Sequence, residues 1–142
     1  MSVRELHPDE PNFSAMVAML RAADLHTTDL QDGEPRYFML DDGAAFGGLT
    51  TLGATALLRS VVVTENKRRR GSGSLLVRKI LEHARDAGVR EAWLLTIDAE
   101  PFFARLGFST AIRANAPAAI AATSQFRDLC PASAVLMRKA LT

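Results

Sequence analysis

The segment from Lys67 to Ser74 has the residue types and spacing of an anion-binding site. It reads Lys-Arg-Arg-Arg-Gly-Ser-Gly-Ser and lies between a β-branched run, 61–64, and an apolar segment that begins at Leu75. The first turn of a helix carries backbone N–H groups without internal acceptors, and the helix dipole adds partial positive charge there. Glycines let the backbone approach a ligand closely, and the four cations add Coulomb attraction. We therefore expect this loop to bind the phosphates of a cofactor.

A solvated surface and a nucleic-acid contact are two other interpretations of the basic run. The position of the run, between a strand of buried type and a helix with Gly-x-Gly at the turn, favours phosphate binding. The third glycine of Gly-x-Gly-x-x-Gly would fall at Leu76, and no Gly-Lys-Ser/Thr is present. The two better-known loops for dinucleotides and nucleoside triphosphates are therefore not expected.

The bulk properties limit the class of protein. A chain of 142 residues, 48% hydrophobic and 23% charged, is expected to form one domain, 1–142. Seventeen Lys and Arg balance sixteen Asp and Glu, so nothing draws the whole chain toward nucleic acid or membrane. The single cysteine, Cys130, excludes an intrachain disulfide and a metal site of several thiolates. The first ten residues do not resemble a secretory signal, so a cytoplasmic location is expected.

Hydrophobic periodicity and turn residues predict the elements that position the loop. Strands are expected at Val3–Leu6, Tyr37–Leu40, Ala44–Thr51, Ala56–Thr64, Glu91–Ile97, Phe108–Ile112 and Ala134–Met137. Helices are expected from Pro11 onward, over Leu25–Leu30, from the glycine loop to Gly88, from Pro101 to Arg105, and over Ala116–Ala122. The strand–helix–strand order around the loop implies a right-handed crossover between parallel strands. The predicted fold class is α/β, with a mixed sheet and helices on both faces.

Together these pieces resemble the GNAT superfamily of acetyl-CoA-dependent N-acetyltransferases. The resemblance rests on Arg68-x-x-Gly71-x-Gly73 between strand and helix, and on the segment 102–108, Phe-Phe-Ala-Arg-Leu-Gly-Phe. Within the superfamily, the segments 56–60, 122–126 and 129–138 are similar to small acetyltransferases associated with arsenic-resistance operons. The resemblance covers essentially the whole chain. It implies a splayed parallel strand pair, with a V-shaped opening between ends near Val63 and Ile97, and a homodimer.

The resemblance also implies which residues hold acetyl-CoA. The pantetheine arm would pair with the first strand of the opening, and the loop amides would hold the pyrophosphate. The residues so assigned are Val61, Val62, Val63, Arg68, Arg69, Arg70, Gly71, Ser72, Gly73, Ser74, Phe102 and Phe103. Arg69 stands where the family often has glycine, and its side chain could face solvent or the 3′-phosphate. No metal is expected.

Acetyl transfer from a thioester needs a donor for the oxyanion and an outlet for the thiolate. By resemblance, the donor is a backbone N–H at a bulge near Val62 or Val63. The family's thiolate-protonating tyrosine matches Phe103, which has no proton to give. A thiol with a pKa of about 8.5 can leave as thiolate near neutrality. Alternatively Tyr37, the sole tyrosine, reaches the site from another strand, or it is simply packed.

An alkyl ammonium with a pKa of about 10.4 must lose a proton before it attacks. Asp98, Glu100 or Glu34 could take this proton, directly or through water. Asp98 is the first choice because it follows a strand that walls the opening, although it could instead cap the next helix. Of the three histidines, His26 is the one retained as a site candidate.

The acceptor side is indicated by Arg59, which interrupts an apolar strand. A buried guanidinium needs an anion, either a substrate carboxylate or an internal carboxylate. Thr123 and Ser124 could line the same pocket, or act as caps and turn residues. One cysteine cannot capture arsenic through several thiolates, so an arsenic-containing acceptor would be an organoarsenical amine.

Three functions follow from these observations. The leading hypothesis is N-acetylation of a small, amino-acid-like amine with acetyl-CoA. The second is an acyl-CoA-binding sensor without turnover, which the phenylalanine at position 103 suggests. The third is nucleic-acid binding through the basic run, which would weaken steeply with salt.

Overall fold

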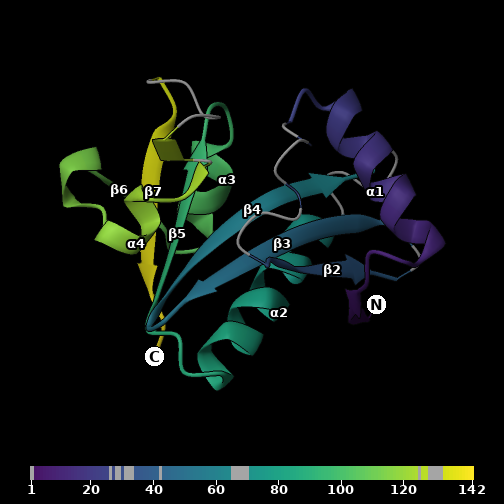
Figure 1. The fold of residues 1–142 in the computed structure, drawn as a ribbon, viewed down its shortest axis with the longest axis horizontal. Helices are drawn as coiled ribbons and strands as arrows, with labels where there is room; N and C mark the ends of the chain where they lie inside the picture. The colour runs from purple at the N-terminus through teal and green to yellow at the C-terminus, as the bar shows by residue number, and fades with distance from the viewer. Residues whose placement is uncertain are drawn as a thin grey trace.

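The computed structural model describes residues 2–25, 27, 30, 34–41, 43–64, 71–124, 126–127 and 133–142. Figure 1 shows the course of the chain. The elements in chain order are β1 (Val3–Leu6), α1 (Pro11–Ala22), β2 (Arg36–Leu40), β3 (Ala45–Leu52), β4 (Thr55–Val63), α2 (Ser72–Asp86), β5 (Glu91–Thr96), α3 (Glu100–Arg105), β6 (Ser109–Ala111), the 3₁₀ helix η2 (Arg113–Asn115), α4 (Ala118–Ala121) and β7 (Val135–Ala140).

The strands form one seven-stranded sheet in the order β1-β2-β3-β4-β5-β7-β6. Neighbouring strands are antiparallel except β4 and β5, which are parallel and joined through α2. The predicted mixed sheet with one parallel pair is therefore confirmed. The predicted hairpin is also present, because β2 and β3 pair from Leu40 and Ala45 outward.

Two adjacent glycines on β3 show which helices cover which face. A Cβ on Gly47 would lie 2.9 Å from Ile80 Cδ1 of α2, whereas one on Gly48 would lie 2.7 Å from the ring of Tyr37. That ring packs edge-on against Phe13 of α1, with centroids 5.4 Å apart. Because successive strand residues point to opposite faces, α1 and α2 cover opposite faces of the sheet.

The two shorter helices complete these layers. Phe102 of α3 lies beside the start of α2, so α3 shares the α2 face. Ile120 of α4 packs with Leu57 and Trp93, on the face opposite α2. The expectation of helices on both faces is therefore confirmed. Among the described residues, no helix is both long and apolar enough to span a bilayer.

The least accurate predictions lie in the C-terminal third. The final strand extends to Ala140 rather than Met137, because its last residues pair with the start of β5. The expected helix 116–122 is shortened to α4, preceded by η2. Ala116 is extended, with ψ 137°, because the ring of the following residue, Pro117, disfavours the helical conformation of the residue before it. The helix expected over 25–30 lies largely outside the described residues.

Candidate active site

The parallel strands β4 and β5 separate after three paired residues. Thr55, Ala56 and Leu57 pair with 91–93, and the rest of β4 runs on without a ladder to β5. Beyond Leu57, β4 remains hydrogen-bonded to β3, and beyond Trp93, β5 remains hydrogen-bonded to β7. The facing edges of 58–63 and 94–96 therefore open away from each other, which confirms the predicted V-shaped opening. An unpaired strand edge presents N–H and C=O groups that an extended ligand can pair with.

A bulge interrupts β4 inside this opening. Gly48 pairs with Arg59 and Phe46 pairs with Val62, so Ser60 and Val61 together lie opposite one residue of β3. Ser60 has φ +57°, a left-handed conformation that non-glycine residues rarely adopt. The bulge thus lies one residue before the predicted oxyanion donors at Val62 and Val63. An extra residue disrupts the local ladder and frees backbone groups there.

The helix α2 begins directly against the end of β4. Gly71 is its N-cap, in the left-handed region at φ +76°, and its carbonyl accepts a bond from the Leu75 N–H at 2.9 Å. A Cβ on Gly73 would lie 3.1 Å from Val63 Cγ2 and 3.2 Å from Phe102 Cζ. The predicted residues Val63, Gly73 and Phe102 are therefore brought together. Ser72 is buried and Ser74 half-buried in the same turn, whereas Arg68, Arg69 and Arg70 lie outside the described residues.

The two phenylalanines of α3 have different surroundings. Phe102 is half-buried beside Gly73. Phe103 is 7% exposed and packs edge-on against Phe102 and Phe108, at centroid distances of 4.9 and 5.8 Å. Phe103 therefore belongs to the core beneath α3, and Phe102 is the ring next to the helix start.

Tyr37 lies away from the opening, on β2. It is 2% exposed, and its hydroxyl donates to the Leu30 carbonyl at 2.7 Å. The strand β3 lies between β2 and β4. This placement favours the packed alternative over thiolate protonation.

Arg59 is buried in β4, with 5% of its surface exposed. Its Cγ lies 3.3 Å from the Cβ position of Gly48, so its stem crosses the glycine on the α1 face. Thr50, two residues further along β3, is 3% exposed on that face. Sequence reasoning missed Thr50, because threonine in a strand is an ordinary β-former and gives no signal.

The remaining predicted residues lie near the ends of their elements. Asp98 is exposed just beyond β5, and it does not cap α3, whose N-cap is Ala99. The Ala99 N–H instead donates to Thr96 Oγ1 at 3.0 Å.

Thr123 makes turn contacts, because its hydroxyl donates to the Ile120 carbonyl at 2.7 Å. Ser124 is half-buried after α4, Glu34 is exposed, and His26 lies outside the described residues.

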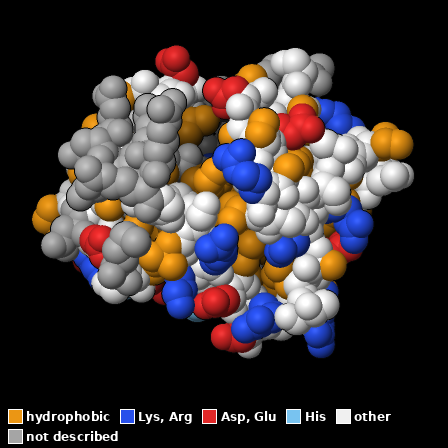
Figure 2. All heavy atoms as spheres, turned by 180° about the vertical axis from the view of Figure 1, so that it is seen from behind, with side chains coloured by type: hydrophobic (Ala, Val, Ile, Leu, Met, Phe, Trp, Pro, Cys, Tyr) orange, Lys and Arg blue, Asp and Glu red, His pale blue; other side chains and the backbone are white. Residues whose placement is uncertain are grey.

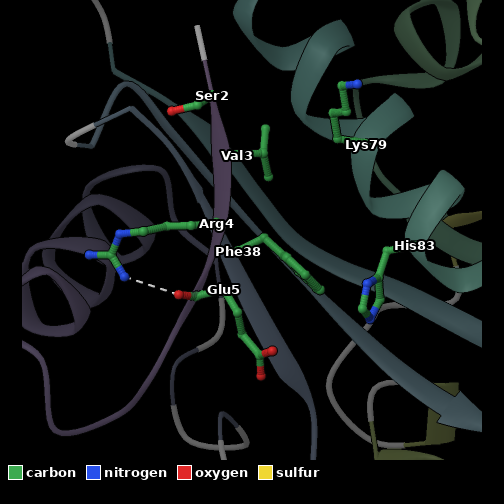
Figure 3. A pocket seen from close by; sticks show the side chains of 7 residues that line it. All are labelled: Ser2, Val3, Arg4, Glu5, Phe38, Lys79 and His83. Carbon is green, nitrogen blue, oxygen red and sulfur yellow. Dashed lines mark hydrogen bonds between the residues drawn. The ribbon is translucent and has the colours of Figure 1, made fainter.

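A separate depression of about 510 Å³ lies between β1 and α2 (Figure 3). It is lined by Ser2, Val3, Arg4, Glu5, Phe38, Lys79 and His83. Arg36 bridges the two sides, because its guanidinium pairs with Glu5 and lies 2.7 Å from His83 Nε2. The hydrogen bond from Arg36 lowers the pKa of Glu5. None of the predicted site residues lines this depression.

Neither the charge distribution on the rear face (Figure 2) nor the described His, Cys, Asp and Glu residues indicate a further binding site. Figure 2 shows the rear of the molecule, where basic side chains alternate with acidic and apolar ones. Over the described ranges, no group of three or more His, Cys, Asp or Glu could hold a metal ion.

Several solved structures are similar to this one over almost the whole chain. The structure is similar to N-acetylglutamate synthase from Neisseria gonorrhoeae complexed with coenzyme A and N-acetyl-glutamate, at TM-score 0.82 and 19% identity, over 99% of this chain and 35% of that chain. It is also similar to Rv2747 from Mycobacterium tuberculosis in complex with CoA, at TM-score 0.81 and 18% identity, over 100% of both chains. An aminoglycoside 6'-N-acetyltransferase complexed with coenzyme A gives TM-score 0.74 and 15% identity, over 100% of this chain and 98% of that one.

These likenesses establish the fold, and the chain spans about a third of the length of the Neisseria synthase. No curated protein matches the sequence. The family model for GNAT acetyltransferases matches residues 1–108, three quarters of the chain. The open β4 edge, the glycine-led helix and this match lead to one conclusion: the chain belongs to the acetyltransferase (GNAT) family.

Proposed function

We propose that the protein, acting as one domain over 1–142, transfers an acetyl group from acetyl-CoA to the amine of a small molecule. The observation that carries this proposal is that the ladder between β4 and β5 ends at Leu57, while β4 continues to the first turn of α2. An extended pantetheine arm can pair with backbone groups of Val61–Val63, while N–H groups of 72–74 bind the pyrophosphate. Because Gly73 has no side chain, the first turn of α2 packs directly against Val63 and Phe102, which brings its N–H groups next to the end of β4.

The bound co-substrate supplies the acetyl thioester, and the protein's own groups position and stabilise the reaction. An N–H of the bulged segment, at Val62 or Val63, is proposed to donate to the developing oxyanion. The neutral amine attacks the carbonyl carbon, so the C–N bond forms and negative charge moves onto the oxygen. When the carbonyl re-forms, the C–S bond breaks and its electron pair leaves with sulfur, while the proton on nitrogen passes to Asp98 directly or through water. Phe103 is apolar and Tyr37 is bound to Leu30, so the thiolate is proposed to leave without a tyrosine acid.

The proposed acceptor is an amino-acid-like amine whose carboxylate is bound by Arg59. Its support is the burial of Arg59 on the α1 face, together with the N-acetyl-glutamate bound by the Neisseria synthase. An internal ion pair is the alternative role for this guanidinium. By resemblance, an organoarsenical amine is included among the acceptors to test, and a homodimer is the proposed assembly.

The test is the release of free thiol from acetyl-CoA by the full chain, scanned over small amines. We expect release with at least one amine bearing a carboxylate, and none without protein. If no amine releases thiol while coenzyme A still binds, the protein is a sensor instead, as the phenylalanine at position 103 would permit. If a DNA duplex binds and coenzyme A displaces it, the basic run from Lys67 to Arg70 binds nucleic acid.

Asp98→Asn should lower kcat for the best amine by about 100-fold or more, because general-base help is typically worth about 10² to 10⁴-fold. Asp98 is exposed at the end of β5, where it can accept the amine's proton directly or through water. The pH dependence of kcat provides the measurement. Asp86→Asn is the matched control, because Asp86 is exposed at the far end of α2. Equal rates for both variants would remove Asp98 as the base.

A further inference from the structure

Two polar side chains are buried side by side on the sheet face that α1 and α4 cover. They are Thr50 of β3 and Arg59 of β4, at 3% and 5% exposure. Gly48 pairs with Arg59, and Thr50 follows two residues later on the same face. Thr50 and Arg59 are therefore diagonal neighbours across antiparallel strands, a spacing that a long side chain can reach across.

The Thr50 hydroxyl has no hydrogen-bond partner among the described residues, although its oxygen is buried. Burying a hydroxyl without a partner costs free energy that an apolar side chain would not cost. A valine, which is also β-branched, would fill the same place in the strand without a polar group to satisfy. The hydroxyl therefore lowers stability, and a ligand that bonds to it would account for its presence.

The place of this pair in the fold indicates what the ligand is. Thr50 lies opposite Leu57, the last residue of β4 that pairs with β5, so the pair adjoins the point where the strands part. Figure 1 shows β4 running between α4 and α1. The cofactor helix α2 covers the other face. A group bound here would therefore approach the opening from the side opposite that helix.

We propose that Thr50 is a specificity-determining residue of the acceptor subsite, where its hydroxyl donates to the acceptor's carboxylate beside Arg59. The inference rests on the proposed function and adds a second residue, Thr50, to the recognition of the acceptor's carboxylate. A carboxylate has several acceptor sites, so it can take the Thr50 bond and the guanidinium bonds together.

The test compares acetylation of the twenty standard L-amino acids with that of their α-amides, in wild type, Thr50→Val, Thr50→Ser and Thr51→Val. We expect wild type to prefer an acid over its amide, and Thr50→Val to reduce that preference about 10- to 100-fold in kcat/KM, the worth of a hydrogen bond to a charged group. Thr50→Ser should retain most of it. Thr51 is exposed on the next position of β3, so Thr51→Val should behave as wild type.

Thermal unfolding supplies a readout independent of activity. Thr50→Val should unfold at or above the wild-type temperature, because it removes an unsatisfied hydroxyl. An unchanged acid preference in Thr50→Val, a wild type that prefers amides, or a marked loss of stability in Thr50→Val would each overturn the inference. A wild type that acetylates no amine at all overturns the proposed function itself, before any variant is compared.

Discussion

Gly73→Val is expected to weaken coenzyme A binding by about 100-fold or more, roughly 2.7 kcal/mol. A Cβ at this position would already lie 3.1 Å from Val63 and 3.2 Å from Phe102, and valine adds two further carbons. Val63 has little rotamer freedom, and Phe102 is braced edge-on by Phe103. The start of α2 must therefore move away from β4, and its free N–H groups move with it. Titration calorimetry with coenzyme A on the folded variant measures the loss.

Gly53→Ala is the control for this experiment. Gly53 has φ +67° in the turn between β3 and β4, and a Cβ there would meet nothing within 4 Å. The Gly53→Ala substitution should cost about 1–2 kcal/mol of stability through backbone strain. It leaves unchanged the contacts at the opposite end of β4, where α2 begins. Coenzyme A should bind this variant as tightly as wild type. Tight binding by folded Gly73→Val would show that the pyrophosphate is held elsewhere.

Gly48→Ala should lower the free energy of unfolding by about 1–3 kcal/mol, the usual cost of overpacking a core. The new methyl would lie 2.7 and 2.9 Å from two ring atoms of Tyr37 and 3.3 Å from Arg59 Cγ. The ring cannot easily move, because its hydroxyl donates to the Leu30 carbonyl and the ring packs against Phe13 in a T-shaped arrangement. The arginine stem must shift as well, so acceptor KM should rise together with the loss of stability. Urea denaturation and steady-state kinetics measure the two effects.

Substitution of the adjacent glycine, Gly47, provides a matched comparison for the loss of stability. Gly47→Ala places its methyl 2.9 Å from Ile80 Cδ1, the far end of a flexible side chain on α2. Ile80 can adjust its terminal torsion at small cost, whereas an aromatic ring moves as a rigid body. Gly47→Ala should therefore lose less stability than Gly48→Ala. The reverse order would mean that the α2 face, and not the α1 face, is the more tightly packed.

Much of the fold could be predicted from the sequence because its signals are local. The apolar stripe of α1, with Phe13, Met16 and Leu20 buried, follows from helical spacing alone. The strand, glycine loop and helix around Gly71 and Gly73 are also contiguous in sequence. Pro117 shows the limit of periodicity, since an alanine-rich run predicts a longer helix than the proline permits.

Residues that are neighbours in the chain were enough to predict that a β-strand leads through glycines into a helix. The packed fold was needed to show that Phe102 lies against the first turn of this helix, that Phe103 lies in the core, and that the Tyr37 hydroxyl bonds to the Leu30 carbonyl. It alone placed Thr50 beside Arg59. The reason is physical: helix starts and glycine turns depend on neighbouring residues, whereas cross-strand contacts depend on register, and in β4 a bulge at Ser60 shifts that register.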